Sequence, residues 1–234
     1  MLLLLTDAIW AQQPAILVFG DSLSAGYGLP QGKGWVDLLR QRLQNNGSNH
    51  EVVNASISGE TTLGGRSRLA GVLAAHRPQI VILELGANDA LRGQSLATVR
   101  ENLIRMVRDC QAAKARVLLV GMRIPPNYGP DYTKKFQDIY AEVAQQTKAT
   151  LVPFLMAGFA DRRDMFQSDG VHPAVAAQAQ MLDNVWARLS GMLSGPDPRK
   201  TNRAAGRKDE AGNRFALASK VPVNRPVKRG SHFI

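Results

Sequence analysis

Residues 15–24 read AILVFGDSLS, an apolar run that stops at a glycine and continues into a short polar turn. An apolar run of this length is typical of a fully buried strand. Similar runs recur along the chain and alternate with segments of helical spacing. We expect strands at 15–19, 51–57, 80–85, 116–120 and 151–154. We expect helices at 35–43, around 69–73 ending before Pro78, at about 95–114 and 132–147, and from Pro173 to about 193.

Short strands that are apolar throughout need helices on both of their faces, which is the arrangement of a parallel sheet. The alternation therefore predicts an α/β fold with a three-layer, doubly wound, five-stranded parallel sheet. The predicted domain covers residues 14–195. We interpret residues 1–13 as a truncated signal-like or disordered lead, and residues 196–234 as a basic disordered tail.

Charge and cysteine content exclude several classes of protein. The chain of 234 residues carries a net charge of +10, but residues 196–234 alone hold 10 Lys and Arg against 3 Asp and Glu. The body is nearly balanced and has no polynucleotide-binding motif, so we expect no nucleic-acid partner. One cysteine, Cys110, excludes an internal disulfide and a cysteine-based zinc site, and its helical spacing indicates a buried thiol. No apolar run approaches about 18 residues, so we expect no transmembrane anchor.

Reactive side chains follow four of the five predicted strands. Ligands of an open parallel sheet bind outside the carboxyl ends of its strands, so we compared the segments that follow them. These segments are GDSLS at 20–24, SISGET at 56–61, GAND at 86–89 and SDGVHP at 168–173. A hydroxyl, small turns, an amide and an acid–imidazole pair at one edge are the components of an acyl-transfer enzyme.

The hydroxyl is assigned by its position after the first strand, and the imidazole by elimination. Ser22 is the candidate nucleophile, although a serine in such a turn often caps a helix instead. Of the four histidines, His172 is the candidate base, because the others lie in a polar turn, at a helix end and in the tail. Asp169 is close enough in sequence to orient the His172 ring, with capping of the last helix as its alternative role. Pro173 indicates that this helix begins directly after His172.

A tetrahedral intermediate also needs donors for its oxyanion. We expect these donors to be the backbone N–H of Ser22, the backbone N–H of Gly59 and the side-chain amide of Asn88. Glu84, at the end of the third strand, is interpreted as a hydrogen-bonded structural residue, with electrostatic tuning of the site as the alternative.

These four segments, in this order, resemble the conserved blocks of the SGNH (GDSL) hydrolase family. Within it, the segments LRG at 91–93 and IPPNYG at 124–129 are similar to the bacterial thioesterase I, lysophospholipase and arylesterase branch. The resemblance covers about residues 14–193. It implies a flavodoxin-like sheet, catalysis by Ser22, His172 and Asp169, an oxyanion hole completed by Gly59 and Asn88, and no metal or organic cofactor.

The sequence thus predicts a serine esterase or thioesterase that acts on small acyl esters and thioesters through an acyl-enzyme. Apolar residues after the third and fourth strands are expected to line the acyl groove, namely Ala90, Leu91, Ile124, Pro125 and Tyr128. A carbohydrate O-acetylesterase of the same fold and a non-catalytic flavodoxin-like binding module are the alternatives. We expect a monomer in the periplasm or outside the cell, and in the cytoplasm if residues 1–13 are not part of a signal.

Overall fold

The computed structural model describes residues 13–194. The predicted lead and tail lie outside these residues, apart from Gln13, so their boundaries stay predictions. The described part contains a five-stranded parallel sheet in the order β2-β1-β3-β4-β5, which confirms the predicted fold class. Its strands are β1 (Ala15–Gly20), β2 (Glu51–Asn54), β3 (Ile80–Glu84), β4 (Arg116–Val120) and β5 (Thr150–Val152).

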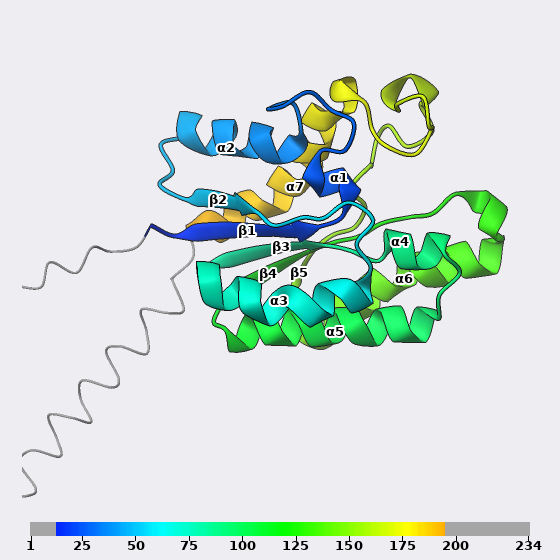
Figure 1. The fold of residues 1–234 in the computed structure, drawn as a ribbon, viewed down its shortest axis with the longest axis horizontal. Helices are drawn as coiled ribbons and strands as arrows, with labels where there is room; N and C mark the ends of the chain where they lie inside the picture. The colour runs from blue at the N-terminus through cyan, green and yellow to red at the C-terminus, as the bar shows by residue number, and fades with distance from the viewer. Residues whose placement is uncertain (1–12, 195–234) are drawn as a thin grey trace, which may run out of the picture. The chain divides into compact units, whose positions relative to one another are not determined.

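Helices cover both faces of the sheet (Figure 1). One face carries α2 (Trp35–Asn45) and α7 (Gln178–Leu193), and the other carries α3 (Thr62–His76), α5 (Leu96–Ala112) and α6 (Pro130–Thr147). Every residue of β1 and β3 is buried, as expected for strands packed between two helical layers. Cys110 is also buried, on the face of α5 that packs toward the sheet, as its spacing predicted.

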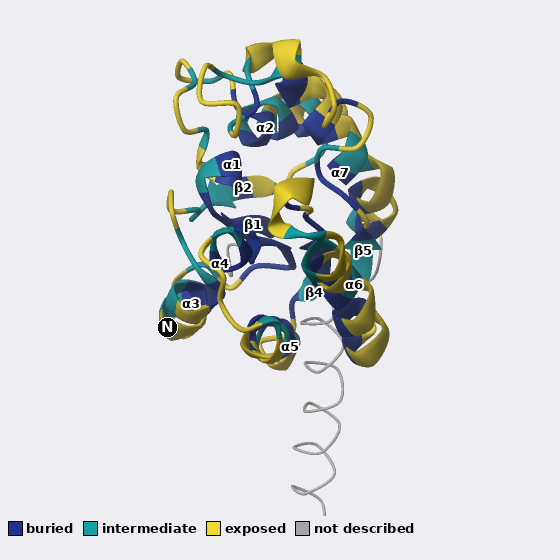
Figure 2. Cartoon of the chain, turned by 90° about the vertical axis from the view of Figure 1, so that its right-hand side faces the viewer, coloured by how far each residue is buried: buried dark blue, intermediate teal, exposed yellow. Residues whose placement is uncertain are grey.

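The short helices lie at the carboxyl edge of the sheet, which faces the viewer in Figure 2. They are α1 (Ser22–Ala25) after β1, α4 (Ala87–Leu91) after β3, and the 3-10 turns η1 (Pro126–Tyr128), η2 (Arg163–Met165) and η3 (Val175–Ala177). Strand order reverses between β1 and β3, because β2 lies outside β1 and the later strands lie beyond β3. The carboxyl ends of these two strands therefore form the expected position for a ligand.

The starts of two helices differ most from the sequence prediction, and β2 ends at Asn54 rather than at residue 57. Helix α3 begins at Thr62, well before the apolar residues that mark it, because Thr61 accepts a hydrogen bond from the Gly64 N–H and caps its first turn. The prediction that the last helix begins at Pro173 is wrong, because this helix begins at Gln178. Pro173 instead forms an isolated antiparallel bridge with Phe166, so tertiary pairing holds this segment extended.

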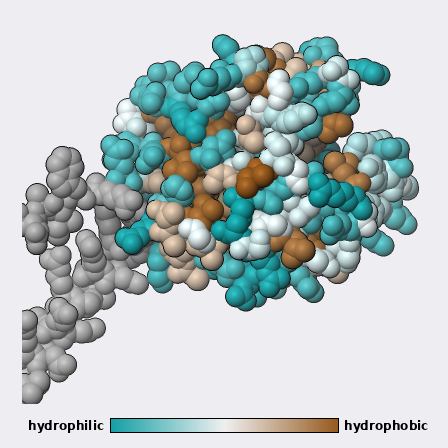
Figure 3. All heavy atoms as spheres, viewed as in Figure 1, coloured by the Kyte–Doolittle hydropathy of each residue, from teal (hydrophilic) through white to brown (hydrophobic). Residues whose placement is uncertain are grey.

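Surface hydropathy and helix composition bear on the environment of the protein. On the face shown in Figure 3, hydrophobic and hydrophilic side chains are interspersed, which is ordinary for a surface exposed to water. Among the helices within residues 13–194, none combines the length and the apolar character that crossing a membrane requires.

Candidate active site

The turn after β1 is built around a buried acidic residue. Asp21 caps α1 by accepting a hydrogen bond from the Leu23 N–H at 3.0 Å, so the cap is Asp21 and not Ser22. Below the turn, the Glu84 carboxylate accepts from the Ser24 hydroxyl at 2.7 Å and from the Asp21 N–H at 3.3 Å. A Cβ on Gly20 would lie 2.6 Å from Glu84 Oε2, so only glycine fits there. The turn that carries Ser22 is thus fixed from beneath.

The structure brings Ser22, His172 and Asp169 into one hydrogen-bonded chain. His172 Nε2 lies 2.9 Å from Ser22 Oγ, and His172 Nδ1 lies 2.7 Å from Asp169 Oδ2. With the proton on Nδ1, the ring donates to Asp169 and its Nε2 accepts from the Ser22 hydroxyl. Asp169 does not cap the last helix, which begins nine residues after it at Gln178.

Hydrogen bonds keep Asp169 ionised. Its Oδ1 accepts from the backbone N–H groups of His172 and Val171, both at 2.9 Å. These two backbone bonds, followed by the bond from the His172 ring, lower the pKa of Asp169 to about 2. A carboxylate that stays charged at neutral pH can hold the imidazole in one tautomer and stabilise the imidazolium.

Two residues that the sequence did not identify support the His172 loop. The Tyr27 ring lies against the His172 ring with a centroid distance of 4.6 Å. The Gln167 amide donates to the Tyr27 carbonyl at 2.9 Å, and the Gln167 N–H donates to the His172 carbonyl at 2.7 Å. Tyr27 and Gln167 are 140 residues apart in sequence, so no local signal could have paired them.

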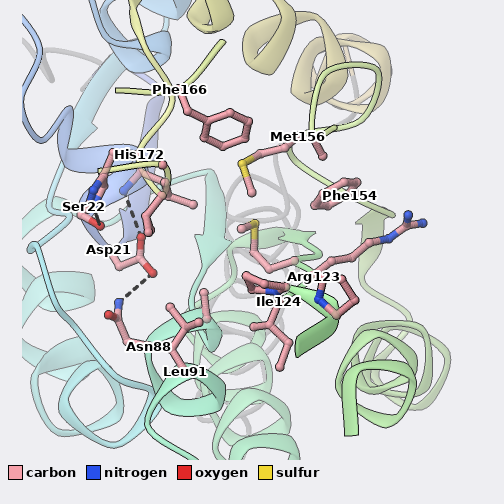
Figure 4. A pocket seen from close by; sticks show the side chains of 18 residues that line it. Asp21, Ser22, Asn88, Leu91, Arg123, Ile124, Phe154, Met156, Phe166 and His172 are labelled. Atoms are coloured by element: carbon pink, nitrogen blue, oxygen red, sulfur yellow. Dashed lines mark hydrogen bonds between the residues drawn. The ribbon is translucent and has the colours of Figure 1, made fainter. Parts of the chain in front are cut away.

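Asn88 lies on α4, facing the serine turn, and its amide donates to Asp21 Oδ2 at 3.0 Å (Figure 4). Gly59 lies in the loop after β2 with a φ of +78°, a conformation that favours glycine, and its carbonyl accepts from Arg92 at 3.1 Å. Asp89 accepts from the N–H and the hydroxyl of Thr62, which joins α4 to α3. Asn88 lines the cavity beside Ser22, whereas Gly59 is not among the lining residues.

Asp21 and Glu84 form a buried acidic pair beneath Ser22. Burial raises the pKa of Asp21 to about 6, against the effect of its hydrogen bonds from Leu23 and Asn88. Burial, together with the neighbouring Asp21, raises the pKa of Glu84 well above its ordinary range. Glu84 is fully buried and hydrogen-bonded, which agrees with the structural interpretation of this residue.

A cavity of about 510 Å³ opens beside Ser22. Asp21, Ser22, Asn88 and His172 form one end of it, and most of the remaining wall is apolar (Figure 4). The lining residues beyond that polar end are Leu23, Ala87, Leu91, Met122, Arg123, Ile124, Pro125, Pro126, Phe154, Met156, Ala160, Phe166, Gly170 and Val171.

Of the five residues predicted to line the acyl groove, three line this cavity and two do not. Leu91, Ile124 and Pro125 line the cavity. Tyr128 does not, because its hydroxyl donates to the Leu91 carbonyl at 3.1 Å outside it, and Ala90 is fully buried behind the wall. The aromatic and sulfur side chains that follow β5 were missed, although their apolar character after a strand end was a usable signal. Across residues 13–194, no group of three or more His, Cys, Asp or Glu side chains is arranged to hold a metal ion.

Comparison with known proteins gives consistent matches. Residues 18–180 match the GDSL-like lipase/acylhydrolase family. The chain is 48% identical over 192 residues to "Esterase TesA" of Pseudomonas aeruginosa, covering 82% of this chain and 94% of that protein. It is 40% identical over 184 residues to "Thioesterase 1/protease 1/lysophospholipase L1" of Escherichia coli, covering 79% and 87%. The crystal structure of the psychrotrophic esterase EstA from Pseudoalteromonas sp. is similar, with a TM-score of 0.74 and 40% identity over 78% of this chain and all of that one.

Proposed function

The chain belongs to the GDSL-like lipase/acylhydrolase family, and we propose that Ser22, His172 and Asp169 carry its reaction as nucleophile, general base and orienting acid. Its relatives are named as esterases, an arylesterase and thioesterases, and the chain is a serine esterase/thioesterase of the SGNH family. The observation that carries the residue roles is the hydrogen-bonded chain from Asp169 through His172 to Ser22 at the mouth of an apolar cavity.

The first half of the reaction forms an acyl-enzyme. Ser22 Oγ attacks the acyl carbonyl carbon while His172 Nε2 takes the hydroxyl proton, and the carbonyl π electrons move onto oxygen. The N–H groups of Ser22 and Gly59 and the amide of Asn88 are the proposed donors to this oxyanion. The carbonyl re-forms as the bond to the leaving alcohol or thiol breaks, and His172 gives that group its proton.

The second half repeats these steps with water. His172 takes a proton from water, the resulting hydroxide adds to the acyl carbon, and the Ser22 oxygen leaves with the proton. The product is a free carboxylic acid, and the enzyme returns to its starting state. Asp169 stays ionised throughout and fixes the ring that moves the proton.

The cavity supports an acyl chain as the group bound beside Ser22. Met122, Ile124 and Phe154 offer few partners to the hydroxyl groups of a sugar, and burying an unpaired hydroxyl is costly. Their burial against an acyl chain is favourable. This favours aryl esters, acyl thioesters and lysophospholipids over acetylated carbohydrates as the substrates.

The experiment is hydrolysis of p-nitrophenyl acetate, p-nitrophenyl octanoate and a palmitoyl thioester by the wild type and by Ser22→Ala. We expect kcat to fall by about four to six orders of magnitude in the variant. Ser67→Ala removes an exposed hydroxyl from α3 and serves as the matched control, with unchanged rates. A fluorophosphonate probe should label the peptide that contains Ser22. Full activity of a folded Ser22→Ala protein, or labelling elsewhere, would refute these roles.

We also propose, from sequence alone, that the enzyme works as a monomer in the periplasm or outside the cell. The apolar start of the chain motivates the location, and it lies outside the described residues. Light scattering of the purified protein and fractionation of cells that express the full chain test the two statements. A dimer in solution or activity confined to the cytoplasm would contradict them.

A further inference from the structure

The substrate cavity is polar at both ends and apolar between them. One end holds the nucleophile and its partners. Of the fourteen residues that line the rest of the wall, thirteen are apolar or glycine. The exception is Arg123, which lies across the cavity from Ser22 (Figure 4). Apart from His172, it is the only basic residue in the lining.

Arg123 is held in place by an aromatic ring rather than by an acid. Its guanidinium carbon lies 4.6 Å from the centroid of the Phe154 ring, and Phe154 itself lines the cavity. Within residues 13–194, Arg123 forms no ion pair with a carboxylate. Its side chain is exposed at this outer end. A stacked guanidinium keeps its planar array of N–H donors, which suits a carboxylate or phosphate.

The sheet sets the spacing of the two segments that carry Ser22 and Arg123. Ser22 follows β1 and Arg123 follows β4, and β3 lies between these two strands. Neighbouring strands lie about 4.8 Å apart, so the two strand ends are roughly 10 Å from each other. An acyl chain whose carbonyl is at Ser22 would therefore pass the apolar wall before its far end reaches Arg123.

We propose that Arg123 forms an anion subsite for the distal end of the acyl group, so that the enzyme accepts acyl chains ending in a carboxylate, the half-esters of dicarboxylic acids. The proposal rests on the function proposed above. A carboxylate that stops short of Arg123 lies against the apolar wall without a partner, which is unfavourable. A carboxylate that reaches the guanidinium gains a charge-assisted hydrogen bond. Acceptance of the charged substrate therefore depends on chain length.

The test compares matched substrates of equal length. The charged series is the mono-p-nitrophenyl esters of adipic, suberic and sebacic acid, and the neutral series is p-nitrophenyl hexanoate, octanoate and decanoate. For each length, the ratio of kcat/KM for the charged ester to that for the neutral ester is measured. In the wild type we expect the ratio to be low for the shortest pair and to rise once the carboxylate reaches Arg123.

Variants separate the guanidinium from other causes. In Arg123→Gln the ratio at the favoured length should fall by about three- to fivefold, the size expected for a partly exposed ion pair. Arg123→Lys should retain part of the preference, and added salt should weaken it in the wild type. Arg108→Gln removes an exposed cation from α5, outside the cavity lining, and should leave both series unchanged.

The outcomes distinguish a failure of the anion subsite from a failure of the proposed function on which it rests. If the wild type hydrolyses neither series, the proposed function fails. If it hydrolyses the neutral esters, but the rise of the ratio with length is the same in wild type and Arg123→Gln, the anion subsite is refuted and the chain end simply reaches solvent. A rise that is present in the wild type and in Arg108→Gln and lost in Arg123→Gln supports the subsite.

Discussion

Asp21 precedes Ser22 in the chain and Asp169 hydrogen-bonds His172, and the surroundings of these two aspartates are opposite. Asp21 is 1% exposed, and burial raises its pKa to about 6. The Asp169 side chain is 40% exposed, and three hydrogen bonds lower its pKa to about 2. The same type of side chain thus serves two different purposes at these two positions. Asp169 is a permanent charge for the imidazole, whereas Asp21 is a packed group that holds α1 and Asn88 in place.

Replacement of the exposed aspartate should have the largest effect. Asp169→Asn keeps the size of the side chain but presents an N–H₂ group or a neutral oxygen to His172 Nδ1. The imidazole then loses the partner that fixes its tautomer, and we expect kcat to fall by about four orders of magnitude. Esterase assays measure the rate, and thermal unfolding at neutral pH should show a moderate loss of stability as well, because the variant lacks the charge that the His172 and Val171 N–H groups stabilise. A loss below tenfold would show that Asp169 does not orient the base.

Replacement of the buried aspartate should act through Asn88. In Asp21→Asn the oxygen can still accept from Leu23, but the new amide faces the Asn88 amide, donor against donor. We expect kcat to fall by about two orders of magnitude, as for the loss of one oxyanion donor.

A double-mutant cycle isolates that route. If Asp21 acts on the reaction only by positioning Asn88, Asp21→Asn adds little to Asn88→Ala, and the two effects are strongly non-additive. Additive effects would mean that Asp21 acts on the reaction by another route. KM should change less than kcat in both single variants, because these contacts matter most in the transition state.

The pKa of Asp21 also predicts a dependence of stability on pH. Its value is raised on folding, so the folded state binds more protons than the unfolded state between about pH 4 and pH 6. Stability from this carboxyl is therefore greatest below about pH 4 and is lost as the pH rises through about 6, by about 3 kcal/mol. Asp169 has the opposite sign, because its contribution is present above about pH 4 and is lost as the pH falls toward 2.

Urea unfolding at pH 4, 5, 6 and 7 measures the Asp21 contribution as the difference between the wild type and Asp21→Asn. The variant should become more stable relative to the wild type as the pH rises across this range, because it carries no charge to bury. A difference that does not change with pH would contradict the raised pKa. The comparison needs no catalysis, so it is independent of the loss of activity.

The same contrast explains what the sequence could predict. Asp169 and His172 are three residues apart in one loop, and Ser22 and Asn88 each follow an apolar strand, so position in the chain was enough to predict that these side chains lie together. The partners of Asp21 are spread over more than sixty residues, and its burial depends on the packing of β1 against β3. Pro173 was misread because its bridge to Phe166 outweighs the usual preference of proline for a first helical turn.

Substitution of Glu84 by Gln should have the smallest effect on kcat. Comparing it with Glu84→Ala separates the role of the charge from the role of the side-chain shape in the buried pair. Burial, together with the neighbouring Asp21, raises the pKa of this carboxyl and so favours its neutral form, whose shape Glu84→Gln keeps. The Gln oxygen can accept from Ser24 and the Asp21 N–H, but its N–H₂ group takes the place of Oε1, which has no hydrogen-bond partner, so we expect a loss of stability of about 1–2 kcal/mol with kcat nearly unchanged. Glu84→Ala leaves both donors unpaired beside a cavity and should cost about 2–5 kcal/mol. Equal losses of stability in the two variants would show that Glu84 is needed as an ion. The interpretation of Glu84 as a neutral buried group would then be wrong.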